Sequence, residues 1–547
     1  MASNLEISDL NKPIEVLALY PQHDHMLQSL FDTRIERDPH RPFVIFRDKT
    51  WSWAAFREVI MRTARMLAAH GIRKGDRIGI IATNSYGHVL FLFALARLRA
   101  IMVPVNPELG VEEARYILDH AGVSAVACSE ETLAVVSEAC SMMRPAPWLM
   151  LLEGQSGSVP VLAELLTNVP DLPLLPEDVS PDDTCAIVYT SGTTGFPKGV
   201  MHSQRSFCMS GERHLERSYL QADGRSLCVL PMFHINALFY SVAGTVAAGA
   251  CLVIAPRFSA SSFWKLAAET RATQANIIMA ASTILARRPR SEFVPGHCLQ
   301  IIIGSPVTEE VANVFRNEFG VKKLVEGFGM TEVPGTFGAP VEGPQTSGSM
   351  GKPGLHPDHS RKWTEARVVD EDGRDVPDDQ TGELWIRIPT MMQGYYRDPE
   401  QTAASFRDGW FMTGDLVRRN AEGFYTFVAR NKDIIRRRGE NIAGAEIDRV
   451  IGAHPSVAEV AAIGVKADIG EEEVLVAIVL KSAAPLTAEE IRAWCAERLS
   501  AFKIPRYVLF VDKLPHTPTH KVAKHMLKKD TTLLERAVDL QKAQKVR

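Results

Sequence analysis

Helical and strand-like patterns alternate through the first part of the chain. Apolar side chains recur at helical spacing over Trp53–Ala68, and His70-Gly71 closes that pattern. The apolar run Arg77–Ala82 follows, and its length is typical of a short buried strand. A second helical pattern, Tyr86–Arg97, and a second apolar run, Ala100–Val105, repeat the order. This βαβ rhythm predicts a parallel sheet covered by helices.

The same rhythm returns further along the chain. Four more strand-like runs are Cys228–Leu230, Cys251–Ile254, Ala275–Met279 and Gln300–Ile303. The 19 residues from Ala237 to Ala255 carry no charge and are long enough to raise the question of a membrane span. Because Gly244 and Gly249 interrupt them, we interpret them as a buried helix followed by a buried strand. We therefore expect no transmembrane span.

The pattern changes after about Gly348, where Gly, Pro and Asp separate short strands and turns such as Asp372-Gly373. This favours an antiparallel β subdomain. From about Asp433 it changes again. The predicted elements are a helix over Gly444–Ala453, strands over Val457–Gly464 and Glu473–Leu480, and a helix that begins at Thr487 with a T-x-x-E capping box.

Together these patterns predict an α/β fold in two parts. The larger is an N-terminal domain over residues 1–431, built of subdomains whose parallel sheets are flanked by helices, with a β-rich subdomain at about 348–430. The smaller is an α+β cap domain over residues 432–547.

Composition narrows the class of protein. The chain has 547 residues, 46% of them hydrophobic, and a net charge of −4, which does not favour a nucleic-acid-binding protein. Its eight cysteines are scattered and form no zinc pattern, as expected for reduced thiols in the cytoplasm. Charged residues near the N-terminus, such as Glu6 and Asp9, argue against an ordinary signal peptide.

One segment carries a strong chemical signal. Directly after the apolar strand CAIVY comes Tyr189–Gly199, with the sequence YTSGTTGFPKG. Closely spaced Ser, Thr and Gly can surround phosphate oxygens with N–H groups and hydroxyls, and Lys198 adds a positive charge. The spacing does not match GxxxxGK[ST], so the segment is a phosphate loop of another kind.

The segment TSGTTGFPKG resembles the phosphate signature of the adenylate-forming superfamily, which includes acyl-CoA synthetases, luciferases and adenylation domains. Four further segments resemble motifs of that superfamily in the same order: Phe328–Glu332 (FGMTE), Gly409–Asp415 (GWFMTGD), Arg430–Ile435 followed by Gly439–Asn441, and Pro515–Lys521 (PHTPTHK). The segments PMFHINALFY and IIRRRGENI are most similar to those of crotonobetaine/carnitine-CoA ligase-like acyl-CoA ligases.

The resemblance implies an ATP-dependent acid–CoA ligase. A carboxylate attacks the α-phosphate of ATP with release of pyrophosphate, and coenzyme A then displaces AMP after rotation of the C-terminal domain. The attacking carboxylate is already ionised at pH 7, so the enzyme must neutralise charge and align the reactants. The implied cofactors are ATP, Mg²⁺ and coenzyme A.

The resemblance also implies the nucleotide site. Residues expected to bind ATP or AMP are Thr190, Ser191, Gly192, Thr193, Thr194, Gly195, Lys198, Gly304, Ser305, Pro306, Phe328, Gly329, Met330, Thr331, Asp415 and Arg430. Phe328 would stack on the adenine, whereas Asp415 and Arg430 would meet the ribose. Thr331 and Glu332 would face the α-phosphate, and Glu332 would hold Mg²⁺, because a carboxylate is a hard oxygen ligand.

The C-terminal motifs imply two further roles. Lys521 is the candidate catalytic lysine of adenylation, although His520 replaces the usual glycine before it and Ala429 replaces the glycine before Arg430. Lys432 lies at the hinge position. Arg437, Arg438 and Gly439 are expected to bind coenzyme A, with a solvated basic surface as the alternative.

The acyl pocket is expected near the PMFHINA segment. Its candidate residues are His234, Asn236, Phe239, Met279 and Val333, with His234 close to the reacting carboxylate. These residues are neutral, and a quaternary ammonium substrate would require an aromatic cage or an acidic partner. The sequence therefore favours a neutral aliphatic, alicyclic or aryl carboxylic acid.

Two other functions stay open at this point. A stand-alone adenylation enzyme could load a carrier protein, and an inactive nucleotide-binding homologue could keep the same fold. FHIN stands where amino-acid-activating domains carry an aspartate, and the intact motifs argue against an inactive protein. The expected partners are small molecules, and the sequence leaves a homo-oligomer open.

Overall fold

The computed structural model describes residues 7–155, 157–171, 179–190, 197–304, 308–343, 346, 348–430, 433–437, 440–466, 472–481, 486–499, 503–516 and 521–541. The chain forms two compact units. The first comprises Met1–Gly192, Phe196–Ala366 and Ile386–Phe411, and the second comprises Thr193–Gly195, Arg367–Trp385 and Met412–Arg547.

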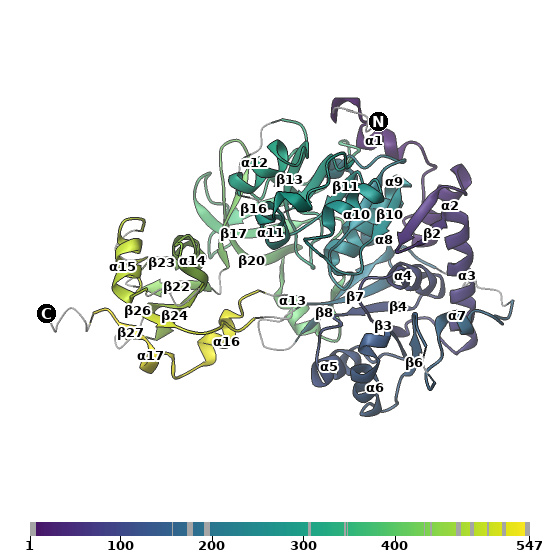
Figure 1. The fold of residues 1–547 in the computed structure, drawn as a ribbon, viewed down its shortest axis with the longest axis horizontal. Coiled ribbons are helices and arrows are strands. Elements are labelled where there is room, and N and C mark those ends of the chain that lie inside the picture. Colours follow the sequence, from purple (N-terminus) through teal and green to yellow (C-terminus); the bar gives the residue numbers. More distant parts are fainter. Residues whose placement is uncertain are drawn as a thin grey trace. The chain divides into compact units, whose positions relative to one another are not determined.

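A seven-stranded sheet forms one part of the first unit (Figure 1). Its strands lie in the order β18 (Gly394–Tyr395), β8 (Lys198–Ser203), β7 (Thr184–Thr190), β4 (Ile101–Val105), β3 (Arg77–Ile81), β5 (Ala125–Cys128) and β6 (Trp148–Leu151). From β7 to β6 neighbouring strands are parallel, whereas β8 is antiparallel to β7 and to β18. Alternate side chains of β3 enter different clusters, because successive residues of a strand point to opposite faces.

A nine-stranded sheet forms the other part of this unit. Its strands lie in the order β15 (Lys352–Pro353), β14 (Phe337–Gly338), β13 (Lys323–Phe328), β12 (Ile301–Gly304), β11 (Gln274–Asn276), β9 (Arg225–Cys228), β10 (Cys251–Ile254), β1 (Pro42–Phe46) and β2 (Lys49–Ser52). The strands from β13 to β1 are parallel, and the outer pairs are antiparallel. Parallel connections of this kind require crossovers, which the helices supply.

Helices pack on both sheets. In the first unit they are α1 (Pro13–Leu17), α2 (Leu27–Arg37), α3 (Trp53–Ala69), α4 (Tyr86–Leu98), α5 (Val111–Ala121), α6 (Leu133–Ser141), α7 (Leu162–Leu165), α8 (Gln204–Ser218), α9 (Ala243–Ala248), α10 (Phe263–Glu269), α11 (Met279–Arg287), α12 (Glu309–Asn317) and α13 (Pro399–Ala404). Single 3₁₀ turns lie at Ile7–Asp9, Glu130–Thr132 and Arg290–Glu292. Helix α8 contacts β8 of one sheet and β12 of the other, so it links the two layers.

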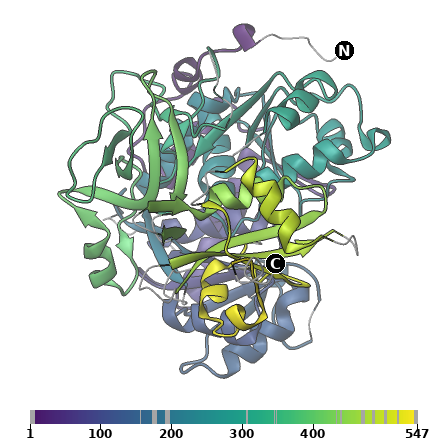
Figure 2. The same cartoon turned by 90° about the vertical axis from the view of Figure 1, so that its left-hand side faces the viewer.

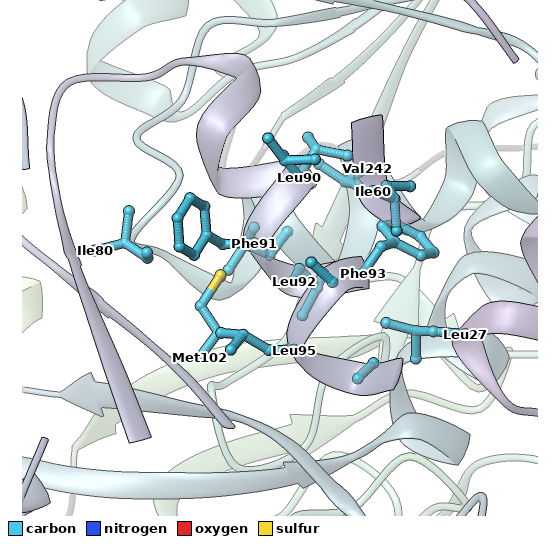
Figure 3. Packing of buried hydrophobic residues seen from close by; sticks show 14 of the residues in the cluster. Leu27, Ile60, Ile80, Leu90, Phe91, Leu92, Phe93, Leu95, Met102 and Val242 are labelled. Atoms are coloured by element: carbon cyan, nitrogen blue, oxygen red, sulfur yellow. The ribbon is translucent and has the colours of Figure 1, made fainter. Parts of the chain in front are cut away.

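The largest core surrounds α4, whose sequence YGHVLFLFALARL is apolar except for His88 and Arg97, and both of these side chains are buried. A helix with this composition has no extended polar face and is stable only when it is enclosed. Figure 3 shows Phe91 of α4 beside Ile80 of β3 and Met102 of β4, with Leu27 of α2 beyond Phe93. None of the described helices combines the length and hydropathy needed to cross a bilayer.

The strands after the first two sheets are mostly antiparallel. β16 (Glu365–Val369), β17 (Thr381–Arg387), β20 (Trp410–Arg419) and β19 (Phe406–Arg407) lie in this order in one sheet, and β21 (Tyr425–Arg430) pairs with β20. In the second unit, β22 (Ile434–Arg437) pairs with β23 (Glu440–Ala443). A four-stranded sheet contains β24 (Val457–Lys466), β25 (Glu472–Leu480), β26 (Tyr507–Phe510) and β27 (Val538–Asp539).

The C-terminal helices are α14 (Gly444–Gly452), α15 (Ala488–Ala496), α16 (Lys524–Lys529) and α17 (Leu533–Arg536). Figure 2 shows these helices and their strands in yellow-green and yellow. The expected α/β class, with large parallel sheets and a smaller α+β C-terminal region, is confirmed. The domain boundary at residues 431/432 stays a prediction.

Three predicted elements differ from the structure in extent. The strand expected at Cys228–Leu230 lies at Arg225–Cys228, and that expected at Ala275–Met279 lies at Gln274–Asn276. The predicted helix after Ala237 is a π-helix over Asn236–Val242 that continues into α9. A short apolar run does not show whether its last residues belong to a strand or to the start of a helix. Met279, predicted to end a strand, begins α11.

The capping box at α15 allows a stability prediction. The Glu490 amide donates to Thr487 Oγ1 at 3.2 Å, and the Glu490 carboxylate accepts from the Thr487 amide at 2.8 Å. We expect Thr487→Ala to lower the free energy of local opening by about 1 kcal/mol, so first-turn amides of α15 exchange about fivefold faster. Hydrogen exchange measures this, with Thr487→Ser as the control that keeps the hydroxyl. Equal exchange in all three proteins would contradict the prediction.

Candidate active site

The hairpin β7–β8 brings the two ends of the predicted phosphate loop together. Thr190 is the last residue of β7, Lys198 is the first residue of β8, and the two are paired across the ladder. The strand segment before Thr190 is buried, so the sheet fixes the base of the loop. The Lys198 ammonium lies 5.1 Å from the centroid of the Tyr395 ring, within reach of a cation–π interaction.

Glu332 contacts the hydroxyl of Tyr395. The Tyr395 hydroxyl donates to Glu332 Oε1 at 2.9 Å, and the Glu332 side chain is buried. Burial and the neighbouring carboxylate raise the pKa of Tyr395, so this hydroxyl keeps its proton and acts as a donor. Tyr395 belongs to β18, which pairs with the same strand β8 that carries Lys198. Lys198, Tyr395 and Glu332 therefore form one linked group, which we call the Tyr395 cluster.

Thr331 is held by a buried histidine. His202 Nε2 lies 2.7 Å from the carbonyl oxygen of Thr331, and Nδ1 lies 3.1 Å from Ser206 Oγ. Burial lowers the pKa of His202 to about 4, so the ring is neutral at pH 7 and Nε2–H donates to the carbonyl. This contact fixes the backbone beside Glu332 against β8.

The predicted acyl residues gather at the π-helix. His234 is half-buried just before it, and Phe239 is fully buried with its ring centroid 4.8 Å from that of His202. Asn236 Oδ1 is buried and has no hydrogen-bond partner among the described residues, so it can accept from a ligand. Val333 is buried next to Glu332. π-Helical turns are frequent at functional sites because they displace side chains from the regular helical positions.

The predicted adenine segment follows two neighbouring strands. Gly304 ends β12 opposite Glu326 of β13, and Phe328 ends β13 half-buried with its ring 6.2 Å from that of Phe337. Gly329 is exposed and Met330 is half-buried in the turn that follows. The parallel pairing therefore directs both segments to the same edge of the sheet.

Asp415 and Arg430 pair in the second unit. They lie opposite each other in the β20–β21 ladder, and Arg430 Nε is 2.7 Å from Asp415 Oδ1. The Asp415 side chain is fully buried, whereas that of Arg430 is 46% exposed. The Asp415 amide donates to Thr413 Oγ1, which in turn donates to the carbonyl of Leu384. A carboxylate in such an ion pair keeps oxygen lone pairs that can accept hydrogen bonds from hydroxyls.

Lys521 lies near this pair in the same unit. Its side chain is exposed, but partial loss of hydration lowers the pKa of its amine; the positive charge of Arg430 lowers it further and Asp415 opposes the effect. Arg437, predicted to bind coenzyme A, is buried. Its Nε lies 2.6 Å from Glu473 Oε2 and its Nη1 donates to the carbonyl of Ile504, so its charge is met within the unit.

Several predicted site residues lie outside the described residues. They are Ser191, Gly192, Thr193, Thr194, Gly195, Ser305, Pro306, Lys432, Arg438, Gly439 and His520, together with the side chain of Met279. His202 and Tyr395 are site residues that the motifs do not contain. The position of His202 directly after the apolar pair Val200-Met201 of β8 was the available signal for it, whereas nothing in GYYRDPE distinguished Tyr395.

Known proteins are similar to this chain in sequence and fold. The family model of AMP-binding enzymes matches residues 31–396, and that of the AMP-binding enzyme C-terminal domain matches residues 446–521. A crotonobetaine/carnitine–CoA ligase of Citrobacter koseri is 30% identical over 92% of this chain and 98% of its own. A sulfoacetate–CoA ligase of Cupriavidus necator is 30% identical over 92% of this chain and 97% of its own. The structure of O-succinylbenzoate coenzyme A synthetase (MenE) from Bacillus subtilis, in complex with ATP and magnesium ion, superposes with a TM-score of 0.80, at 26% identity over 91% of this chain and 99% of its own.

Proposed function

The chain belongs to the family of AMP-binding enzymes, and from that premise we propose that it is an ATP-dependent acid–CoA ligase. It activates a carboxylic acid as acyl-AMP with release of pyrophosphate, and coenzyme A then displaces AMP to give the thioester. The resemblance to acyl-CoA ligases of the adenylate-forming superfamily is confirmed by these matches.

The observation that carries the proposal is the Tyr395 cluster. It holds a cation, Lys198, over the ring of one tyrosine and a carboxylate, Glu332, at the hydroxyl of the same tyrosine. A triphosphate that chelates a divalent cation presents negative phosphate oxygens, which suit Lys198, and a positive ion, which suits Glu332. The Tyr395 cluster therefore suits the polyphosphate end of ATP. The β8–β18 pairing fixes Lys198 and Tyr395 relative to each other before the substrate arrives.

Magnesium fits the donors present. Glu332 accepts a hydrogen bond from Tyr395, and its carboxylate has further lone pairs, while the Thr331 hydroxyl is a second oxygen donor on the adjacent residue. When bound there with ATP, the ion would neutralise phosphate charge. Tyr395 and His202 would keep Glu332 and Thr331 in position throughout.

The residues of this chain then divide the adenylation step. His234 and Asn236 orient the acid carboxylate, and Thr331 donates to the α-phosphate. Asp415 accepts from the ribose hydroxyls, with Arg430 paired to its carboxylate. Lys521 places its ammonium between the acid carboxylate and the α-phosphate, where negative charges converge in the transition state. Rotation of the C-terminal domain about Lys432 then removes Lys521 and admits coenzyme A.

The decisive experiment is ATP–pyrophosphate exchange over a panel of carboxylic acids, followed by AMP release with coenzyme A or with free carrier protein. We expect exchange with at least one acid and AMP release with coenzyme A. AMP release with carrier protein alone would instead identify a carrier-loading enzyme. No exchange with any acid, in a protein that still binds ATP, would identify an inactive homologue.

Tyr395→Phe tests the link to magnesium. Losing the hydroxyl removes the hydrogen bond that orients Glu332, and loss of such a supporting contact reduces metal affinity about 10-fold or more. We expect the Mg²⁺ concentration for half-maximal exchange to rise about tenfold at saturating ATP. Tyr396→Phe, which removes a neighbouring phenol, should leave it unchanged. An equal shift in both variants would argue against a specific role for Tyr395.

A further inference from the structure

Helix α16 begins with a lysine that forms an ion pair with α14. The Lys524 ammonium donates to Asp448 Oδ2, and the two side chains are 15% and 24% exposed. A positive charge in the first turn of a helix is opposed by the partial positive charge of the helix N-terminus, so helix formation alone does not favour a lysine there. The ion pair with Asp448 therefore accounts for this residue at this position.

Asp448 joins three elements of the second unit. The residue belongs to α14, its Oδ2 accepts from Lys524 of α16, and its Oδ1 accepts from the Ala462 amide of β24 at 2.6 Å. Partial burial raises the pKa of Asp448, and Lys524 opposes that effect. The carboxylate and the ammonium thus depend on each other, because removing one leaves a partly buried charge without its partner.

The backbone on the two sides of Lys521 is paired. An antiparallel bridge joins Val522, the residue directly after Lys521, to His516. The Ala523 amide donates to the carbonyl of Pro515 at 2.7 Å, and α16 begins at the next residue. Since this paired backbone is continuous with α16, a movement of the first turn of α16 moves Lys521 as well.

Apolar contacts hold the rest of α16. Leu527 is buried in a cluster that contains Ala461 and Ile463 of β24 and Leu509 of β26. These contacts do not involve Lys524, so they keep the helix on the sheet when the ion pair is removed. The ion pair therefore controls mainly the first turn of α16, which is the end nearest to Lys521 in the sequence.

We propose that Lys524 is a positioning residue for adenylation: its ion pair with Asp448 fixes the first turn of α16 and thereby the place of the Lys521 ammonium. Lys521 acts between two converging charges, and a displacement of about 1 Å at such a site can reduce the rate about 10²-fold. Lys524 acts through Lys521 and needs no contact with the substrates. This inference rests on the proposed acid–CoA ligase activity and on the role proposed there for Lys521.

The first test separates the two half-reactions. Lys524→Met removes the ammonium and keeps the length of the side chain. We expect ATP–pyrophosphate exchange to slow about 10- to 100-fold, whereas thioester formation from supplied acyl-AMP stays within about threefold of the wild type. Asp448→Asn should slow the same step. The double variant should be no slower than the slower single variant, because both changes remove the same ion pair. Lys529→Met, an exposed lysine of the same helix, is the matched control and should behave as the wild type.

The second test does not depend on activity. The rate at which acetic anhydride labels Lys521, followed by mass spectrometry over a pH series, gives the pKa of its amine. Partial loss of hydration and Arg430 lower that pKa in the wild type. We expect it to rise toward that of an ordinary lysine in both single variants, because both displace Lys521. A purely electrostatic effect would have opposite signs, since Lys524→Met removes a positive charge and Asp448→Asn removes a negative one.

The outcomes separate the two claims. Unchanged exchange in Lys524→Met, or a pKa of Lys521 that stays constant or shifts in opposite directions, would overturn the positioning role and keep the ligase function. Equal slowing of both half-reactions with a lower unfolding temperature would also overturn it, because the ion pair would then serve the fold alone. No exchange with any acid in the wild type would overturn the ligase function, and the labelling would still decide whether Lys524 places Lys521.

Discussion

Lys521→Ala is expected to slow formation of acyl-AMP by about 10²- to 10³-fold while leaving thioester formation from supplied acyl-AMP within about threefold of the wild type. The ammonium acts only where the acid carboxylate and the α-phosphate converge, so the second half-reaction does not need it. ATP–pyrophosphate exchange measures the first step, and release of AMP from acyl-AMP plus coenzyme A measures the second. Lys529→Ala, an exposed lysine of α16, is the matched control.

The pH dependence of adenylation in Lys521→Ala gives a second test. The charged form of Lys521 is the active one, and its pKa is lowered by partial loss of hydration and by Arg430. Adenylation should therefore decline as pH rises through that lowered pKa, earlier than for an ordinary lysine. Lys521→Ala should lack this decline. Equal loss of both half-reactions in Lys521→Ala would contradict its assignment to adenylation alone.

Glu332→Gln is expected to reduce adenylation by about 10²- to 10³-fold and to raise the Mg²⁺ requirement. The amide keeps the shape of the side chain and an oxygen that can accept from Tyr395, so the change removes mainly the negative charge. A titration of Mg²⁺ at fixed ATP separates weaker ion binding from a slower chemical step. Glu371→Gln removes an exposed carboxylate and should change neither quantity.

A wild-type Mg²⁺ dependence in Glu332→Gln would show that the metal lies elsewhere. Thermal unfolding of Glu332→Gln and Glu371→Gln shows whether any loss of activity comes instead from loss of folded structure. Glu332 is buried beside Tyr395, whose pKa is raised. Replacing the buried Glu332 carboxylate by a neutral amide should therefore not destabilise the protein.

The elements of the fold could be predicted where the chemistry is local. The buried strands β3 and β4, the mainly apolar helix α4 and the capping box at Thr487 follow from spacing and residue type alone. The π-helix could not be predicted, since its widened turn depends on packing against α8, α9 and the nine-stranded sheet. The observed boundaries of β9 and β11 also differ from the predicted ones, because an apolar run in the sequence does not show where strand pairing ends.

The site residues divide in the same way. Asp415, Glu332 and Lys521 could be proposed because they lie in motifs, whereas Tyr395 and His202 act through contacts with residues 63 and 129 positions away. The burial of Arg213 and Arg217 could not be predicted from the sequence. In the sequence GERHLERS they alternate with glutamates like any solvated charged helix. Both arginines are nonetheless buried in α8.

The pairing of β8 with β18 has a consequence for how this enzyme can diversify. Lys198 and Tyr395 stand on a hydrogen-bonded ladder, so their spacing changes only if the ladder itself changes. The acyl residues Asn236 and Phe239 stand instead on the π-helix, where single side chains can be exchanged without disturbing that ladder. Substrate range can therefore change through mutations on this helix while the triphosphate end of the enzyme stays constant. A selection for new acids should collect its substitutions on Asn236–Val242 and spare β8 and β18.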